Sequence, residues 1–411
     1  MTRPTLKVAL IGAALSANKG AAAMVETVIA RQPSVSGPCA FALLTTYPAA
    51  DAPLVPAGAP VRVVGLEPLR LALVEFPLAL VARAARVLRL PLGWVRARAC
   101  RAILDADVVV DVAGISFSDG RGVPITVYNA LMTGLPLLLG TPTVKAAQAI
   151  GPVTRPLNRS LARAVLPHLA AVCARGAQTG VHLDALGLRN VVDVADLAFS
   201  LDEAPHLPPA VDALVTSLDE YVVVMPSSVV RRLFEATGGN YVAAAADLIR
   251  SIRATTGRAV VIAPHSFRAG KGEDRMNDGP VCREIASLLS DDSGVHHVDA
   301  ELTAGELRTL VARSRVLVTS RFHAMISGLS TCTPTIVLGW SHKYREVLDD
   351  FGLVEFGTDV SALAAPQRVV DLVVRCLADR DSLAEQIARA LPAVTAKSAR
   401  NFTVIDAAAR R

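Results

Sequence analysis

The chain has 411 residues, of which 52% are apolar and 4% aromatic, and it carries a formal net charge of +5. This length favours two domains over one, and the apolar content is sufficient to fill two buried cores. No dense run of Lys and Arg is interleaved with aromatic residues, so a nucleic acid is not an expected partner. An anionic small molecule or an anionic membrane surface fits the modest positive charge better.

The six cysteines are scattered along the sequence, and no two of them form a C-x-x-C pair. This pattern is typical of reduced, buried thiols, so we expect a cytoplasmic protein without a disulfide framework or a bound metal. The apolar run that follows Arg3 and Lys7 resembles a signal peptide. Because Gly12, a polar turn and a helical pattern come next, we interpret the run as a first buried strand.

Strand and helix patterns alternate through the first half of the chain. Apolar strands are predicted at residues 6–11, 40–44, 61–64, 107–112, 144–150, 170–173 and 191–194. Helices are predicted at residues 21–31, 68–103 with a break at Pro91, 123–132, 157–166 and 178–186. Strands that are apolar throughout and alternate with helices indicate a parallel sheet covered on both faces.

The helical segment 66–105 comes closest to the length of a membrane span, but charged residues interrupt it. Arg83, Arg86 and Arg89 are spaced to lie along one flank of a helix, beside apolar residues. Two interpretations stay open. The segment is either an ordinary packed helix pair or a basic amphipathic face that contacts the inner face of the plasma membrane.

The proline-rich stretch 204–209 is the best candidate for a linker, because the alternation restarts after it. Strands are predicted at residues 221–224, 259–263, 316–318 and 335–338, and helices at 241–256, 281–289, 304–313, 360–379 and 382–408. We therefore predict an α/β protein with two doubly wound Rossmann-like domains that face a cleft. The predicted N-terminal domain is 1–205 and the C-terminal domain 206–385, and a C-terminal helix, 386–411, could pack back on the N-terminal domain.

Two basic loops follow neighbouring predicted strands of the second half, where ligands of such sheets bind. The first loop contains Ser320, Arg321 and His323, and the second contains Lys343. Ser320 is expected to cap the helix that starts near Phe322. Arg321 has the planar fork that suits a phosphate or carboxylate, and His323 can exchange a proton near neutral pH.

Lys343 opens a helix, where the helix dipole disfavours a cation, and an anionic ligand would explain its position. The alternatives are ordinary structural roles. Arg321 would then pair with a carboxylate across its domain, His323 would be a satisfied buried histidine, and Lys343 would be exposed with its stem packed on Tyr344.

Small and polar residues follow several other predicted strands and face the same cleft. They are Asn18 and Gly20, Ser116 and Asp119, Arg175, and His265. The segment at Asn18 lacks the G-x-G-x-x-G pattern of dinucleotide-binding loops. Ser116 and Asp119 could bind a sugar hydroxyl or simply form a turn, and His265 could face the ligand or be structural.

Together these motifs resemble those of the polysaccharide pyruvyl transferase family, over nearly the whole chain. The resemblance rests above all on Ser320-Arg321-Phe322-His323-Ala324 and Gly339-Trp340-Ser341-His342-Lys343-Tyr344. Weaker matches are Asn18-Lys19-Gly20-Ala21, Asp111-Val112-Ala113-Gly114, Ala147-Gln148-Ala149-Ile150-Gly151-Pro152, Ala174-Arg175, Asp196-Leu197-Ala198-Phe199 and Pro264-His265.

The resemblance implies a fold like that of GT-B glycosyltransferases and a defined reaction. The pyruvyl group of phosphoenolpyruvate would become a ketal on a sugar of a cell-envelope polymer or lipid-linked saccharide, without a cofactor or metal. Arg175, Arg321, Phe322 and Lys343 would bind the phosphoenolpyruvate, and His323 would take part in donor binding or proton transfer.

The chain departs from the family pattern on the side of the acceptor. Arg175-Gly176-Ala177-Gln178-Thr179 stands where family members often have Arg-Asp-x-x-Ser, and the glycine-rich segment is altered to Ala113-Gly114-Ile115-Ser116. Two further functions stay open. One is a nucleotide-sugar glycosyltransferase whose diphosphate would contact Arg321 and Lys343, and the other is a non-catalytic scaffold of envelope-polysaccharide assembly.

Overall fold

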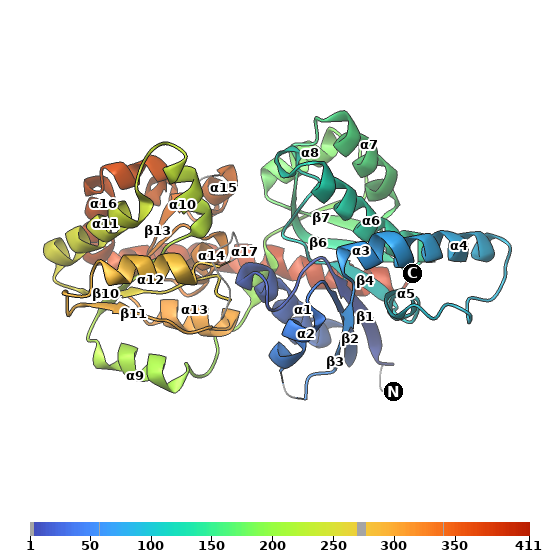
Figure 1. Cartoon of the computed structure of the whole chain (residues 1–411), viewed down its shortest axis with the longest axis horizontal. Coiled ribbons are helices and arrows are strands. Elements are labelled where there is room, and N and C mark those ends of the chain that lie inside the picture. Colours follow the sequence, from blue (N-terminus) through green and yellow to red (C-terminus); the bar gives the residue numbers. More distant parts are fainter. Residues whose placement is uncertain (1–3, 57, 269–276, 340) are drawn as a thin grey trace. The chain divides into compact units, whose positions relative to one another are not determined.

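The computed structural model describes residues 4–56, 58–268, 277–339 and 341–411 (Figure 1). The chain divides into two compact units. Unit 1 contains the chain up to Ala17, then Ala21–Ser200 and Ala396–Arg411, and unit 2 contains Asn18–Gly20 and Leu201–Thr395. The cleft expected between two such domains stays a prediction.

Unit 1 is built on a parallel sheet with the strand order β3-β2-β1-β4-β6-β7-β8, and the short β5 pairs with β6. The strands are β1 (Leu6–Ile11), β2 (Cys39–Thr45), β3 (Val61–Gly65), β4 (Val108–Asp111), β5 (Ile115–Ser116), β6 (Thr143–Ile150), β7 (Ala171–Arg175) and β8 (Val191–Val194). The helices are α1 (Lys19–Ser36), α2 (Pro48–Asp51), α3 (Pro68–Arg70), the π-helical η2 (Leu71–Glu75), α4 (Phe76–Val87), α5 (Arg98–Leu104), α6 (Val123–Leu139), α7 (Pro156–Val165) and α8 (Ala177–Asp184).

The two faces of this sheet bury separate cores, because successive side chains of a strand point to opposite sides. On one face, Val8 and Leu10 of β1 pack in a core that also contains Phe402 and Ile405. On the other, Ala9 and Ile11 pack with residues of α4, α5 and α6. Most positions of the central strands β1, β4 and β6 are therefore apolar on both faces, which is the pattern that predicted them.

Unit 2 has a six-stranded sheet with the order β11-β10-β9-β12-β13-β14, and all its pairs are parallel. The strands are β9 (Tyr221–Met225), β10 (Ala259–Ile262), β11 (Val295–His297), β12 (Val316–Thr319), β13 (Thr335–Gly339) and β14 (Gly357–Asp359). The helices are α9 (Pro209–Ser217), α10 (Ser228–Glu235), α11 (Tyr241–Thr256), α12 (Gly279–Ser287), α13 (Ala304–Ala312), α14 (Phe322–Ser330), α15 (His342–Asp350) and α16 (Gln367–Ala378).

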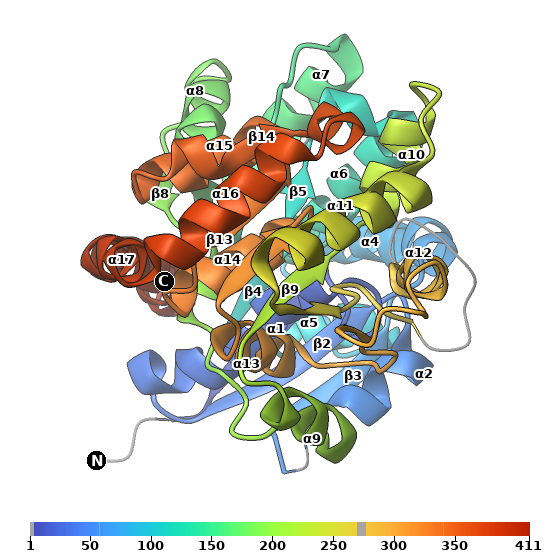
Figure 2. The ribbon, with the colours of Figure 1, turned by 90° about the vertical axis from the view of Figure 1, so that its left-hand side faces the viewer.

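Helices α11 and α16 lie side by side on this sheet (Figure 2). The last helix, α17 (Arg380–Ala409), starts in unit 2, and its residues from Ala396 onward belong to unit 1. The predicted α/β architecture with two parallel sheets is confirmed. Along the described chain, no helix combines the length and the apolar content needed to cross a membrane.

Candidate functional site

The carboxyl ends of four adjacent strands of unit 2 bring polar loops to one edge of the sheet. In spatial order the strands are β10, β9, β12 and β13. The loops carry His265 and Ser266, Ser227 and Ser228, Ser320 and Arg321, and Lys343. The sequence predicts that the two basic loops follow neighbouring strands. In the structure they follow β12 and β13, which are hydrogen-bonded to each other.

The carboxylate of Asp278 connects three of these loops. It is fully buried at the start of α12. One oxygen accepts a hydrogen bond from the Ser228 amide at 2.9 Å, and the other accepts from the Ser266 amide at 3.0 Å. Arg321 completes the arrangement: its Nε donates to Oδ2 at 2.8 Å, and its Nη2 pairs with Oδ1.

The guanidinium of Arg321 is held firmly. This arrangement matches the alternative in which Arg321 pairs with a carboxylate across its domain. Nη2 also donates to Ser228 Oγ at 3.1 Å, and 12% of the side chain is exposed. Burial alone would lower the pKa of Arg321, but Asp278 outweighs burial and raises that pKa above its ordinary value. Arg321 is therefore a fixed cation whose orientation is set before any ligand arrives.

An aromatic cluster joins the two basic loops. The Phe322 ring contacts the rings of His323 and Tyr344 edge-on, at centroid distances of 5.3 and 5.5 Å. Lys343 Nζ lies 4.8 Å from the centre of the Phe322 ring and 5.6 Å from that of Tyr344. The Tyr344 hydroxyl donates to the Ser320 carbonyl at 3.0 Å. Lys343 and His323 thus both contact the ring of one buried phenylalanine.

The predicted cap of α14 by Ser320 is wrong. Arg321 occupies the cap position, and no side chain caps the helix. The hydroxyl that bonds here is that of Thr319, which accepts from the Arg321 amide at 3.0 Å. The next helix, α15, likewise begins without a side-chain cap. A helix start without a side-chain cap favours an anion.

His265 is 5% exposed and lies near His323, Arg321 and Lys19. Burial, followed by His323, Arg321 and Lys19, holds the pKa of His265 well below its ordinary value. Its imidazole is therefore neutral at pH 7, able to accept one hydrogen bond and donate another. The hydroxyl of the next residue, Ser266, is buried without a hydrogen-bond partner among the described residues.

Asn18 and Gly20 belong to unit 2 together with His323. Asn18 Oδ1 accepts from the Gly20 amide at 2.9 Å and so shapes the start of α1. A Cβ atom on Gly20 would lie 2.1 Å from His323 Nδ1. A side chain at this position would displace the His323 ring, so the Asn18–Gly20 segment limits where that ring lies.

The corresponding strand ends of unit 1 hold a buried polar network around Asp111. Its carboxylate accepts from Lys145 Nζ, from Gln148 Nε2 at 2.8 Å and from the Ala113 amide at 3.1 Å. Ser116 is fully buried, and its hydroxyl lies 2.6 Å from Gln148 Oε1. Lys145 was not among the residues predicted from the sequence. A lysine inside an apolar strand indicates a buried ion pair, so its sequence position could have identified it.

Arg175 and Asp119, both singled out from the sequence, have partners within unit 1. Arg175 is 6% exposed, pairs with Asp196 and donates to the Gly114 carbonyl at 2.9 Å. Asp119 accepts from the amide and hydroxyl of Thr154 and from Asn158 Nδ2. These bonds shape loops, and the substrate roles expected of both residues stay predictions.

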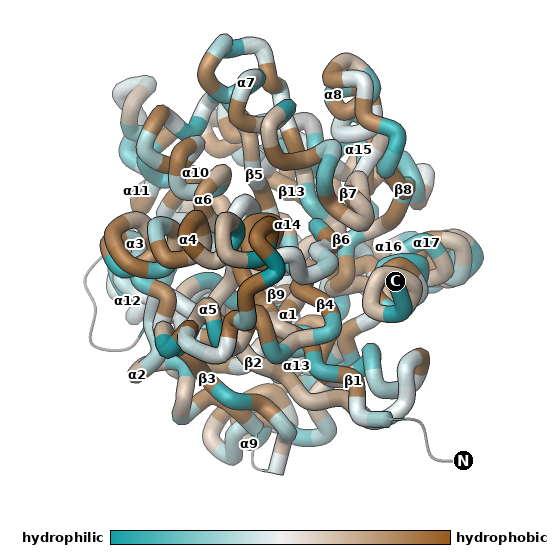
Figure 3. The backbone as a smooth tube through the Cα atoms, turned by 90° about the vertical axis from the view of Figure 1, so that its right-hand side faces the viewer, coloured by the Kyte–Doolittle hydropathy of each residue, from teal (hydrophilic) through white to brown (hydrophobic). Residues whose placement is uncertain are grey.

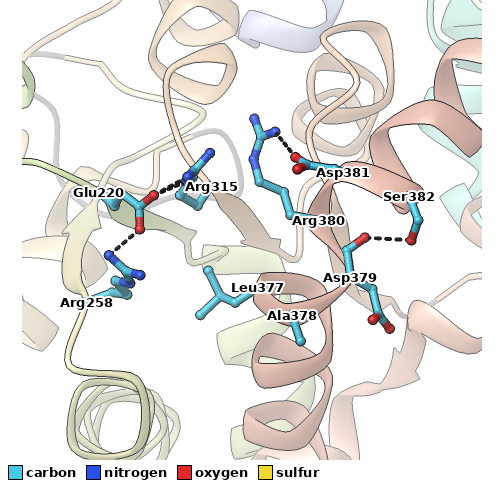
Figure 4. Close-up of a pocket in the computed structure, with 9 residues that line it drawn as sticks. All are labelled: Glu220, Arg258, Arg315, Leu377, Ala378, Asp379, Arg380, Asp381 and Ser382. Atoms are coloured by element: carbon cyan, nitrogen blue, oxygen red, sulfur yellow. Dashed lines mark hydrogen bonds and ion pairs between the residues drawn. The ribbon is translucent and has the colours of Figure 1, made fainter.

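A separate hollow of about 290 Å³ lies in unit 2, lined by Glu220, Arg258, Arg315 and Leu377–Ser382 (Figure 4). Glu220, Arg258 and Arg315 directly precede β9, β10 and β12, so the hollow is at the amino ends of the strands. Two of its three arginines, Arg258 and Arg315, are already paired with Glu220, and the third, Arg380, pairs with Asp381. Ligands of such sheets bind at the other edge, so we do not assign the site to this hollow.

Within the described chain, no cluster of three or more His, Cys, Asp or Glu side chains is placed to hold a metal ion.

Solved structures identify the general class of the fold. A putative UDP-N-acetylglucosamine 2-epimerase from Listeria monocytogenes superposes with a TM-score of 0.58 at 13% identity, over 94% of this chain and 91% of that one. The glycotransferase of kitacinnamycin superposes with a TM-score of 0.54 at 13% identity, over 98% and 99%. The chain thus has the GT-B-like α/β fold shared by such epimerases and glycosyltransferases.

Residues 68–342, more than half of the chain, match the model of the polysaccharide pyruvyl transferase family, and the chain belongs to that family. The match includes Arg321 and His323 and ends one residue before Lys343. General stress protein 30 of Bacillus subtilis (strain 168) is 29% identical over 86 residues, which are 20% of this chain. The aligned part spans a quarter of that relative's length.

Proposed function

We propose that this chain transfers the pyruvyl group of phosphoenolpyruvate to two hydroxyls of a sugar, forming a ketal and releasing phosphate. The observation that carries the proposal is the cationic cluster of Arg321 and Lys343 beside His323, in a chain of the pyruvyl transferase family. Phosphoenolpyruvate bears a phosphate and a carboxylate. Arg321, which Asp278 holds in place, and Lys343 would provide the complementary charge, together with two helix starts that have no side-chain cap.

The proposed reaction begins with transfer of a proton to the methylene carbon of phosphoenolpyruvate, which builds positive charge on the neighbouring carbon. One sugar hydroxyl forms a bond to that carbon and loses its proton. The bond from the carbon to the phosphate oxygen then breaks, and phosphate leaves with the bonding electrons. A second hydroxyl adds to the same carbon and loses its proton, which closes the ketal.

His323 is the proposed proton-transfer group, because it is the imidazole packed against the Phe322 ring beside Lys343. Arg321 and Lys343 would neutralise the phosphate as it leaves. Neutral His265 would accept or donate a hydrogen bond to a hydroxyl of the substrate without adding charge. Asn18 and Gly20 would position His323.

The acceptor would be a sugar of a cell-envelope polysaccharide precursor, carried on a lipid or in a glycolipid. We place the reaction in the cytoplasm, where phosphoenolpyruvate is made. Ser116 of unit 1 is proposed to belong to the binding site for the sugar acceptor. Its hydrogen bond with Gln148 would fix the loop that contacts the acceptor.

Ligand-induced stabilisation tests the donor. Phosphoenolpyruvate at about 100 times its dissociation constant is expected to raise the free energy of unfolding by about 2.7 kcal/mol, and Lys343→Ala is expected to remove most of this gain at the same concentration. UDP-sugars are the matched comparison, since solved structures with this fold include complexes with UDP and with UDP-GlcNAc. Stabilisation by UDP-sugars and none by phosphoenolpyruvate would favour glycosyl transfer instead.

A further inference from the structure

The solvent-facing side of the helical run α3–η2–α4 in unit 1 is apolar. Leu69, Leu73, Leu80 and Val87 are 76%, 72%, 51% and 69% exposed. They are spaced by four and seven residues, which places them on one face of the run. The opposite face, with Leu71, Ala79, Ala82 and Ala85, is buried in the core of unit 1. The run is therefore apolar on both sides, although only the buried side packs against other residues that the structure describes.

The apolar surface continues beyond the stripe formed by Leu69, Leu73, Leu80 and Val87. Nine of the nineteen exposed large apolar side chains of the described chain fall between residues 69 and 94: Leu69, Leu73, Val74, Leu80, Val81, Val87, Leu88, Leu90 and Trp94. Much of the tube through α3 and α4 has the hydrophobic colour in Figure 3. Single exposed apolar residues are ordinary, but a concentration of this kind marks an interaction surface.

The charges around this surface have one sign. Between residues 68 and 98 the chain has six arginines and one acidic residue, Glu75. Glu75 is fully buried and pairs with Arg70 at 3.0 Å. Arg83, Arg96 and Arg98 are exposed. The exposed side therefore combines apolar and cationic groups without an exposed carboxylate.

We propose that this face, defined by residues 69–98, docks on an anionic membrane surface. The stripe would enter the boundary between headgroups and acyl chains, and the arginines would contact lipid phosphates. A second copy of the chain fits less well, because a two-fold contact would place the arginines of both copies against one another. The inference does not depend on the proposed reaction.

Sedimentation with vesicles tests the proposal. The full chain is expected to bind vesicles of equal parts phosphatidylcholine and phosphatidylglycerol, to bind phosphatidylcholine alone weakly, and to dissociate as salt rises. Trp94 is expected to shift its fluorescence to the blue on binding, and Trp94→Phe should abolish the shift. Binding without salt dependence or lipid preference would contradict the cationic part of the proposal.

Variants separate the two contributions. Leu73→Ser with Leu80→Ser is expected to weaken binding about tenfold or more, and Arg83→Gln with Arg96→Gln roughly 30-fold at low salt. The matched control is Leu233→Ser with Leu288→Ser, exposed by 44% and 48% in unit 2, which should bind like the parent chain.

All these side chains are exposed, so the variants should keep the parent melting temperature and its stabilisation by phosphoenolpyruvate. No vesicle binding, or equal loss in the control, would overturn the proposal. It would also be overturned by a dimer that Leu73→Ser with Leu80→Ser dissociates in the absence of any vesicle binding. A failed donor test with intact vesicle binding would reject only the proposed reaction.

Discussion

Asp278 is the residue that orients Arg321 in unit 2. Its buried carboxylate pairs with the guanidinium and accepts hydrogen bonds from the amides of Ser228 and Ser266. Asp278→Ala would leave a buried cation without its partner, so we expect the free energy of unfolding to fall by about 3–5 kcal/mol in denaturant titrations.

The exposed pair Arg283–Asp299, whose side chains are 45% and 48% exposed, is the control for Asp278. Asp299→Ala should cost about 1 kcal/mol or less. Equal losses for the two variants would show that Asp278 does not have the structural role assigned to it.

Gly20 leaves no room for a side chain against His323, since an added Cβ would lie 2.1 Å from Nδ1. Gly20→Ala must displace the imidazole, and a misplacement of about 1 Å can cost about 100-fold in rate. We therefore expect kcat for phosphate release to fall about 100-fold with little change in melting temperature. Gly180→Ala is the control, because nothing lies within 4 Å of its added Cβ. An unchanged kcat in Gly20→Ala would show that this glycine does not position His323 for the reaction.

His265 makes stability depend on pH. Burial and the nearby cations keep its pKa far below 6.5 in the folded chain, whereas the unfolded chain binds a proton below about pH 6.5. Stability is therefore full above about pH 6.5 and falls as pH drops below that value, by up to about 1.4 kcal/mol per pH unit.

His265→Gln should remove this part of the acid-side loss, measured as the difference in free energy of unfolding between about pH 7.5 and pH 5.5. His297, whose pKa burial also lowers, contributes the same background to both proteins. An identical pH dependence in the two proteins would contradict a neutral buried His265.

At the scale of elements, the sequence was most informative where a strand is buried on both sides. Val8 to Ile11 and Val108 to Val110 are apolar because both neighbouring layers are cores. The strands β11 and β14 were missed because each has three residues, which is too short for a periodic signal.

The candidate site was predictable only in part for a related reason. Arg321 and Lys343 lie at the starts of the helices that follow β12 and β13, where the local sequence is basic. Asp278 is 43 residues away from Arg321 along the chain, and no local pattern links the two. The pairing depends on the order of β10, β9 and β12, which a single sequence does not show.

The C-terminal part of α17 completes a core of unit 1. Ile405 is fully buried in the cluster that contains Val8 and Leu10. Ile405→Ala should lower the free energy of unfolding by about 2–5 kcal/mol, because it removes buried methyl groups and leaves a cavity. Arg400→Ala, at an exposed position of the same helix, should change it by about 0.5 kcal/mol or less. A small effect of Ile405→Ala would mean that this helix end is not part of the core.

For the whole molecule, the two units provide different surfaces. Unit 2 presents the fixed Arg321, Lys343, two helix starts without a side-chain cap and a neutral histidine at one sheet edge, which suits a small anion. Unit 1 has the buried network around Asp111 and the apolar, arginine-rich face of residues 69–98. A lipid-carried sugar acceptor would link these features, because the enzyme would meet it at a membrane surface.

The proposed reaction is the transfer of a pyruvyl group from phosphoenolpyruvate to a sugar. The most direct measurement is incubation of the full chain with phosphoenolpyruvate and a panel of lipid-linked sugars, followed by assay of released phosphate and product mass. We expect one phosphate released for each acceptor that gains the mass of one pyruvic acid less one water, and neither change with His323→Ala. Transfer of a sugar from a nucleotide donor to the same acceptors, without release of phosphate from phosphoenolpyruvate, would contradict pyruvyl transfer.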